Sequence, residues 1–272
     1  MDLYTKTSYR LAGEMTRRYS TSFSLSSTLF PAQLRQHIYA VYGLVRIADE
    51  IVDTYKGVDA KEQLAALEAE VMHACSMHYS VNPLVHAFAD TANRYGIDRT
   101  LIRPFFESMT SDIDKTIYTQ AEYEQYIYGS ADVVGLMCLR VFVAGDEERY
   151  QALAPGAKAL GSAYQKVNFL RDLAADYQQL GRVYFPDVDP EQFSETDKQR
   201  IVADIEHDFH RAKTSIAQLP WQARRAVKAS VYYYEALLRS LKHTPAARIA
   251  EQRVRVADWR KIALLVRAGV GL

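Results

Sequence analysis

The dominant feature of the sequence is a helical hydrophobic period that continues over almost its whole length. Few stretches alternate as strands do, and the 12 glycines and 8 prolines leave long segments rich in helix-favouring residues. The pattern predicts helices at 5–19, 32–54, 60–78, 84–95, 98–114, 120–144, 147–179, 192–217, 221–243 and 256–269. No low-complexity linker or internal repeat divides the chain, so residues 1–272 are expected to form one all-α domain.

Composition excludes several classes of protein. With 33 Lys and Arg against 33 Asp and Glu, the formal net charge is zero, which gives no footprint for a nucleic-acid backbone. Cys75 and Cys138 lie far apart, which argues against a disulfide scaffold or a thiolate zinc site and fits a reducing, cytoplasmic setting. The first 19 residues carry charges of both signs, unlike a signal peptide. No stretch approaches 18 uninterrupted apolar residues, so no bilayer span is expected.

A first unusual helix is predicted by the segment PAQLRQHIYAVYGLVRIADEIVD, which starts at residue 31. Asp49 and Asp53 are one turn apart on one face, and Tyr39, Tyr42 and Arg46 join that face at spacings of three and four. An isolated pair of aspartates at this spacing usually belongs to a solvated surface. This face instead combines tyrosines, an arginine and two acids, without the Glu and Lys that coat most exposed helices.

A second polar stripe follows in the C-terminal half of the chain. Gln165, Asn168, Asp172 and Asp176 step by 3, 4 and 4, and Arg171 lies beside them. Mg²⁺ prefers oxygen ligands and commonly bridges carboxylates to substrate phosphate, while arginine pairs with the remaining phosphate charge. Two facing acid stripes therefore indicate a magnesium–phosphate site above a cavity. The seven histidines have no zinc-ligand spacing.

The chain resembles the squalene/phytoene synthase family, the head-to-head prenyltransferases, nearly from end to end. The segments that carry the resemblance are YSTSFSLSSTLFP at 19–31, IYAVYGLVRIADEIVD at 38–53, YIYGSADVVGLM at 126–137, NFLRDLAADYQQLGRVYFP at 168–186 and RVRVADWRK at 253–261. The resemblance implies a helical isoprenoid-synthase fold around a central apolar cavity. It also implies Mg²⁺-dependent ionisation of an allylic diphosphate, with Mn²⁺ able to replace Mg²⁺.

Individual roles follow from the same resemblance. The magnesium ligands that it implies are Asp49, Asp53, Asn168, Asp172 and Asp176. The residues that it implies for substrate binding are Ser22, Tyr42, Arg46, Gln165, Asn168, Arg171 and Arg253. Tyr128 and Tyr233 are expected to line the cavity and to join the four aspartates as catalytic residues.

The sequence departs from the family pattern at several positions. Asp132 stands where the family usually has glycine, and an acid there can bind a third ion, accept the final proton, pair with an arginine, or be an ordinary satisfied helix residue. Lys166 and Val167 replace the usual Leu and Thr, and Lys166 is expected to turn away from the acids. Glu50 stands where a third aspartate often occurs.

Three functions remain open at this point. The favoured one condenses two C20 geranylgeranyl diphosphates to phytoene in carotenoid biosynthesis, without a redox cofactor. The second uses two C15 farnesyl diphosphates to make squalene, dehydrosqualene or hydroxysqualene, with NADPH only if the product is squalene. The third is an inactive assembly factor, which the survival of both aspartate pairs disfavours. The oligomeric state is left open, and peripheral membrane contact is expected for delivery of lipid-like substrates, with the tail at 259–272 as the candidate segment.

Overall fold

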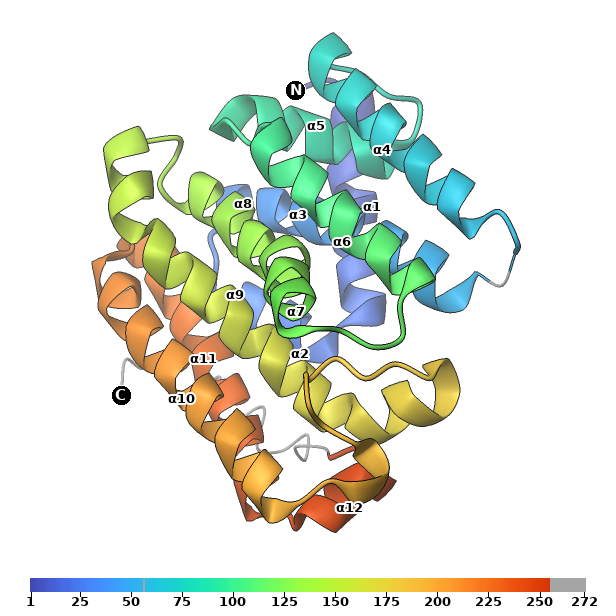
Figure 1. The fold of residues 1–272 in the computed structure, drawn as a ribbon. Coiled ribbons are helices and arrows are strands. Elements are labelled where there is room, and N and C mark those ends of the chain that lie inside the picture. Colours follow the sequence, from blue (N-terminus) through green and yellow to red (C-terminus); the bar gives the residue numbers. More distant parts are fainter. Residues whose placement is uncertain (56, 255–272) are drawn as a thin grey trace.

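A computed structural model describes residues 1–55 and 57–254, and Figure 1 shows that these residues are built from helices joined by short loops. The α-helices are α1 (Leu3–Tyr19), α2 (Thr21–Ser27), α3 (Ala32–Asp49), α4 (Ala60–Met77), α5 (Pro83–Tyr95), α6 (Arg99–Asp114), α7 (Gln120–Ile127), α8 (Val133–Phe142), α9 (Glu147–Ala175), α10 (Glu195–Gln218), α11 (Trp221–His243) and α12 (Ala246–Glu251). Over the described ranges the only β feature is one bridge between Ile117 and Val183. The all-α prediction is confirmed.

Three π-helical turns interrupt helices that the sequence predicts as continuous. They are η1 (Glu50–Thr54), η2 (Tyr128–Asp132) and η3 (Asp176–Leu180), and a short 3₁₀ turn, η4 (Pro190–Gln192), precedes α10. Asp53 lies in η1 and Asp176 begins η3, so each aspartate stripe ends in a widened turn. π-helical turns are rare in proteins, but those that do occur are frequently found at functional sites.

Two short helices were not predicted. The segment before residue 31 is rich in Ser and Thr, which favour caps and turns over helix interiors, but α2 forms there with Ser20 as its N-cap. The second missed helix is α12, six residues long. The predicted helix at 256–269 lies outside the described residues.

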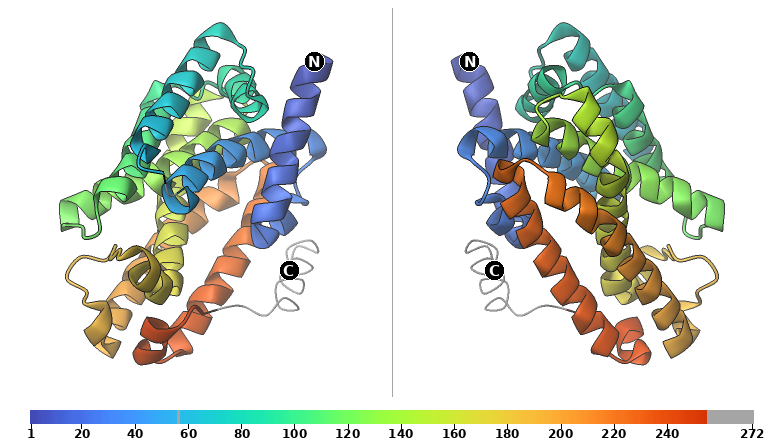
Figure 2. Two further views of the ribbon diagram at one scale, coloured as in Figure 1. Left: turned by 90° about the vertical axis from the view of Figure 1, so that its right-hand side faces the viewer. Right: turned by 90° about the vertical axis from the view of Figure 1, so that its left-hand side faces the viewer.

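The longest helix, α9, crosses the middle of the molecule, with α10 and α11 on one side and α3, α6 and α8 on the other (Figure 1). In the side views, α12 lies at one end of the molecule and the first residues of α1 lie at the opposite end (Figure 2). Within the described part of the chain, no helix is both long and apolar enough to cross a membrane.

The directions of the helices around α9 can be read from their contacts. Lys166 of α9 pairs with Asp208 of α10, whereas Gly156, ten residues earlier in α9, lies against Ser215, seven residues later in α10. The two helices are therefore antiparallel. In the same way Gly161 lies against Ala131, and Gly135 of α8 lies against an earlier residue of α9. The chain that continues from η2 into α8 is also antiparallel to α9.

Gly161 is required by this close approach, because a Cβ there would lie 2.6 Å from the carbonyl oxygen of Ala131. We expect Gly161→Ala to lower the free energy of unfolding by about 1–3 kcal/mol, since backbone must move to admit the methyl group. Gly43→Ala is the matched control: its Cβ would meet Ala12 Cβ at an ordinary 3.5 Å. That variant is expected to keep or slightly raise stability, because alanine favours helix. Denaturant unfolding of both variants tests this, and equal stability of the two would contradict it.

Candidate active site

A cavity of about 320 Å³ lies among α2, α3, α8, α9, α10 and α11. Its wall is mostly apolar. Along α9 the lining begins at Leu153 and ends at Asn168 in alternating steps of three and one, which covers about 22 Å of helix at ~1.5 Å per residue. Two ring pairs line the part of the wall nearest Asn168: Phe23 stacks on Tyr42, and Tyr164 stacks on Tyr234 at 3.9 Å between centroids.

Both aspartate stripes extend from the wall of this cavity. On α9, Asp172 and Asp176 follow Asn168 at steps of four, and on α3, Asp49 follows the lining residue Val45 at the same step. The two pairs meet in space, because the charge of Asp53 is among the causes that raise the pKa of Asp176. The acids therefore lie together at one end of the cavity.

The opposite end is closed by apolar side chains. Since the chain through α8 and the helix α10 are both antiparallel to α9, Phe142, Leu153 and Leu219 lie far from the acids. Phe30 stacks on Phe142 with ring centroids 5.4 Å apart. We call these four residues the cavity floor.

Arg46 lies beside the first aspartate pair. Its Nη1 is 3.8 Å from Asp49 Oδ2, and its Nε donates to Glu50 Oε1 at 3.0 Å. Burial raises the pKa of Asp49 to about 7, helped by the charge of Asp53, although Arg46 acts in the opposite direction. Asp49 thus holds its charge less readily than an ordinary aspartate and would gain from a bound cation.

The second pair has two arginines. Arg171 holds Asp172 with two hydrogen bonds, Nε to Oδ1 at 3.0 Å and Nη2 to Oδ2 at 2.5 Å, and Arg253 Nε reaches Asp172 Oδ1 at 2.6 Å. Burial and the charge of Asp172 raise the pKa of Asp176 to about 7. Arg253, 81 positions from Asp172 along the chain, therefore belongs to the same end of the cavity.

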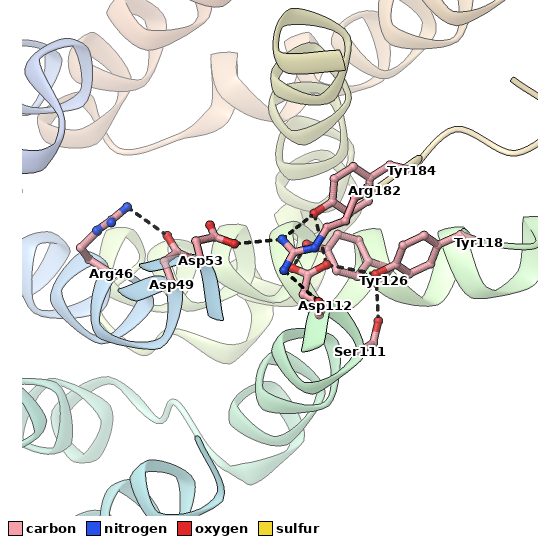
Figure 3. Close-up of polar contacts among 9 residues, drawn as sticks. All are labelled: Arg46, Asp49, Asp53, Ser111, Asp112, Tyr118, Tyr126, Arg182 and Tyr184. Atoms are coloured by element: carbon pink, nitrogen blue, oxygen red, sulfur yellow. Dashed lines mark hydrogen bonds and ion pairs between the residues drawn. The ribbon is translucent and has the colours of Figure 1, made fainter. Parts of the chain in front are cut away.

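Sequence reasoning missed a group behind Asp53 (Figure 3). Arg182 Nη1 donates to Asp53 Oδ1 at 2.9 Å, and Arg182 Nη2 donates to the main-chain oxygen of Asp112 at 2.8 Å. Burial raises the pKa of Asp112 to about 6, while Arg182 and two tyrosine hydroxyls lower it. Arg182 lies inside the LGRVYFP segment that carries the family resemblance, which was a usable signal. Asp112 is one acid among several in a predicted helix, and nothing in the sequence around it marked it as a site residue.

The donor set fits a hard cation. Four of the five proposed ligands are carboxylates, and the fifth, Asn168, has a buried Oδ1 that accepts no hydrogen bond from the described chain. Between residues 1 and 254, with Lys56 left aside, no three His, Cys, Asp or Glu side chains converge closely enough to hold a metal by themselves. Mg²⁺ commonly completes its octahedron with water and substrate phosphate, so the set suits a cation that arrives with a diphosphate.

Several predicted residues are found where the stripes indicated. Tyr42, Gln165 and Asn168 line the cavity near its acidic end. As expected, Lys166 points away from the two aspartate pairs of the site. It faces α10, where its Nζ pairs with Asp204 at 2.5 Å. The side chain of Ser22 is outside what the structure describes.

Two predicted tyrosines do not line the cavity. Tyr128, in the π-turn η2, borders a separate recess with residues of α6 and α7, and its ring lies 5.2 Å from Lys158 Nζ. Of the three consecutive tyrosines on α11, Tyr234 lines the cavity, while Tyr233 packs edge-on against Tyr234 and lies close enough to Arg171 to affect its pKa. Consecutive helical residues point about 100° apart, so only one of them faces a given wall.

Asp132 is also turned from the cavity, although Ser130 and Ala131 line it. Ser162 Oγ donates to Asp132 Oδ1 at 2.8 Å, and burial raises the pKa of Asp132 to about 6. The structure therefore favours the ordinary satisfied helix acid among the four roles considered.

The raised pKa values of Asp49 and Asp176 predict a pH dependence of stability. Both carboxyls bind protons more tightly in the folded chain than in the unfolded chain, where the pKa is about 4. Their contribution to the free energy of unfolding is therefore complete below about pH 4 and is lost as pH rises toward 7. In chelator-treated protein, Asp49→Asn/Asp176→Asn should show a smaller fall in Tm over this window than the unmodified chain. Identical slopes would contradict the pKa values.

Comparisons with known proteins place this geometry in context. A family model described as squalene/phytoene synthase matches residues 16–260. A phytoene synthase from Arthrospira platensis is 26% identical over 283 residues, covering 95% of this chain and 91% of the relative. A 4,4'-diapophytoene synthase from Staphylococcus haemolyticus is 27% identical over 203 residues, covering 74% and 68%. The crystal structure of a dehydrosqualene synthase superposes with a TM-score of 0.83 at 22% identity, covering 98% of this chain and 97% of that one.

Proposed function

The chain belongs to the squalene/phytoene synthase family of head-to-head prenyltransferases, and we propose that it joins two geranylgeranyl diphosphates to form phytoene through a cyclopropylcarbinyl diphosphate. The observation that carries this proposal is the continuity between the apolar cavity and the two aspartate pairs. Each of α3 and α9 presents lining residues along one stripe and acids at its end. That arrangement suits a substrate with a long apolar tail and a diphosphate head.

The main demand on such a site is to stabilise the leaving group, because ionisation separates an allylic cation from diphosphate. Bound Mg²⁺ would act as a Lewis acid on the departing diphosphate oxygens. Asp49, Asp53, Asp172 and Asp176 would hold it together with Asn168. Arginine recognises phosphate through its planar fork of donors. The acidic end of the cavity has three arginines, Arg46, Arg171 and Arg253, beside its aspartates.

The cavity wall suits the carbocation that remains after the diphosphate has left. A carbocation needs surroundings that exclude water and offer only weak nucleophiles. The stacked pairs Phe23–Tyr42 and Tyr164–Tyr234 place aromatic rings in the wall near the acids. A ring face attracts a nearby cation by about 0.5–2 kcal/mol, so these rings would stabilise positive charge as it moves along the prenyl chain of the substrate.

The choice of C20 substrate is supported by the length of the cavity. Its lining extends about 22 Å along α9 at ~1.5 Å per residue, from the acidic end to the floor. The Arthrospira platensis relative, which matches over 95% of this chain, bears the name phytoene synthase. The competing reaction is the condensation of two farnesyl diphosphates. The Staphylococcus haemolyticus relative, which bears the name 4,4'-diapophytoene synthase, supports this second candidate.

One experiment separates the candidates. The purified protein is incubated with Mg²⁺ and labelled farnesyl or geranylgeranyl diphosphate, with and without NADPH, and both diphosphate release and the hydrocarbon are measured. We expect a C40 hydrocarbon from the C20 substrate and no requirement for NADPH. A C30 product alone would establish the C15 reaction, and no diphosphate release with either substrate would identify an inactive assembly factor. We also propose a cytoplasmic enzyme in peripheral contact with membranes; the candidate tail at 259–272 lies outside the described residues.

A further inference from the structure

Arg182 lies behind Asp53, on the protein side of the acidic end. The Arg182 side chain is 7% exposed, whereas the Asp53 side chain bonded to it is 46% exposed. The guanidinium therefore contacts the carboxylate from within the fold, on the less exposed side of Asp53. In Figure 3, Asp53 lies between Asp49 on one side and Arg182 on the other.

The backbone around Arg182 is fixed on both sides. Gly181, with φ of 67°, ends the π-turn η3 in the left-handed region and reverses the chain. The Arg182 amide then donates to the main-chain oxygen of Asp176 at 3.1 Å, and the Val183 amide donates to that of Thr116 at 2.7 Å. Arg182 is thus anchored to both the second aspartate stripe and the loop after α6.

The side chain is anchored as well. Besides Asp53, the guanidinium donates to the Asp112 main-chain oxygen at 2.8 Å and to the Tyr184 hydroxyl at 3.4 Å. Asp112 is itself 7% exposed, and its carboxylate accepts hydrogen bonds from the hydroxyls of Tyr118 (3.0 Å), Tyr126 (2.5 Å) and Tyr184 (3.2 Å). A buried carboxylate needs a nearby cation, and Arg182 supplies it, so the guanidinium has little freedom to leave.

We propose that Arg182, held in place by Asp112 and Tyr184, is a positioning residue that orients the Asp53 carboxylate toward the cation and diphosphate. The proposal rests on the proposed function for the role of Asp53. Groups that hydrogen-bond to a metal-binding carboxylate fix its orientation, and their loss typically lowers metal affinity or activity about 10- to 100-fold. Arg182 is less exposed than Asp53, so it contacts the carboxylate from the protein interior. If the guanidinium instead occupied the place of the cation, Arg182 would be the more exposed residue of the two.

The test measures binding of Mn²⁺ by electron paramagnetic resonance in the presence of inorganic pyrophosphate, without turnover. We expect Arg182→Gln to weaken Mn²⁺ binding by roughly 10- to 100-fold. Arg182→Lys should fall between this variant and the unmodified protein, because one ammonium cannot reproduce the planar fork. Asp112→Asn should weaken binding in the same direction. Combining it with Arg182→Gln should add little, since both act through one contact.

Arg140→Gln is the matched control. Arg140 is also largely buried, with 15% of its side chain exposed; it pairs with Glu147 and lies over the Tyr150 ring at the floor end of the cavity. This variant should bind Mn²⁺ like the unmodified chain. Circular dichroism identifies any variant that fails to fold, and in that case Arg182→Lys and Asp112→Asn decide the question.

Unchanged or tighter Mn²⁺ binding in folded Arg182→Gln would overturn the proposal, and tighter binding would show that Arg182 competes with the cation. Absence of Mn²⁺ binding in the unmodified protein would overturn it too, together with the metal assignment. The proposed function fails separately: if neither prenyl diphosphate turns over while the Arg182 variants still weaken Mn²⁺ binding, the positioning role stands and the reaction does not.

Discussion

Replacing either Asp49 or Asp172 by alanine is expected to lower turnover of prenyl diphosphate by roughly 10³-fold or more, with helical content close to that of the unmodified chain. Each change removes a carboxylate from one of the two pairs that meet at the acidic end of the cavity. The remaining acids cannot hold the same positive charge against the departing diphosphate. Diphosphate release measures the loss, and far-ultraviolet circular dichroism measures the fold.

Asp204→Ala is the control for these two variants. Asp204 is an exposed acid on α10 that shares Lys166 with Asp208, so its removal leaves Lys166 with a carboxylate partner. Its activity should stay near that of the unmodified protein. If Asp49→Ala and Asp172→Ala both kept full activity, the metal-site assignment would be withdrawn.

The two variants should also differ from each other. Asp172 accepts hydrogen bonds from Arg171 and Arg253, whereas Asp49 is 3.8 Å from Arg46, which also binds Glu50. Alanine at position 172 therefore leaves two arginines without that partner, and we expect a larger fall in thermal stability for Asp172→Ala than for Asp49→Ala.

Cys138→Phe is expected to lower kcat/KM for the C20 diphosphate by roughly 10²- to 10³-fold, and much less for the C15 diphosphate. Cys138 lines the cavity on α8 one turn before the floor residue Phe142. A ring at this depth would exclude the last five-carbon unit of the longer chain. At about 0.8 kcal/mol per buried carbon, that exclusion forfeits about 4 kcal/mol of apolar contact.

The other cysteine provides the matched substitution. Cys75 on α4 is partly buried against the core but does not line the cavity, so Cys75→Phe makes the same chemical change elsewhere. It should change stability without changing the ratio of C20 to C15 activity. Equal losses with both substrates in Cys138→Phe would show that the lower cavity does not hold the end of the chain.

The two aspartate stripes could be predicted because one helix carries its own angular information. Spacings of three and four place residues on one face whatever the rest of the molecule does. Hence Asp49 with Asp53, and Asn168 with Asp172, were identified before any tertiary contact was known. The direction of Lys166, two residues from Asn168, followed from the same geometry and is confirmed.

The π-turns limited this approach. The local period changes within η2, and Tyr128, which the family pattern placed in the cavity wall, borders a different recess. On α11 the family pattern indicated Tyr233, and only the packing against Tyr164 identified its neighbour Tyr234 as the tyrosine that faces the cavity.

By itself the sequence determined an all-helical chain with two acid stripes, because both depend on periodicity within single helices. That the two stripes form one site was implied only by the family resemblance of the segments around them. Only the tertiary structure decided which residues close the cavity and what stands behind Asp53. The contact between Arg182 and Asp53 joins positions 129 residues apart, and the stacking of Phe30 on Phe142 joins the loop between α2 and α3 to the end of α8. Such contacts depend on how helices cross and in which direction they run, which a one-dimensional period does not contain.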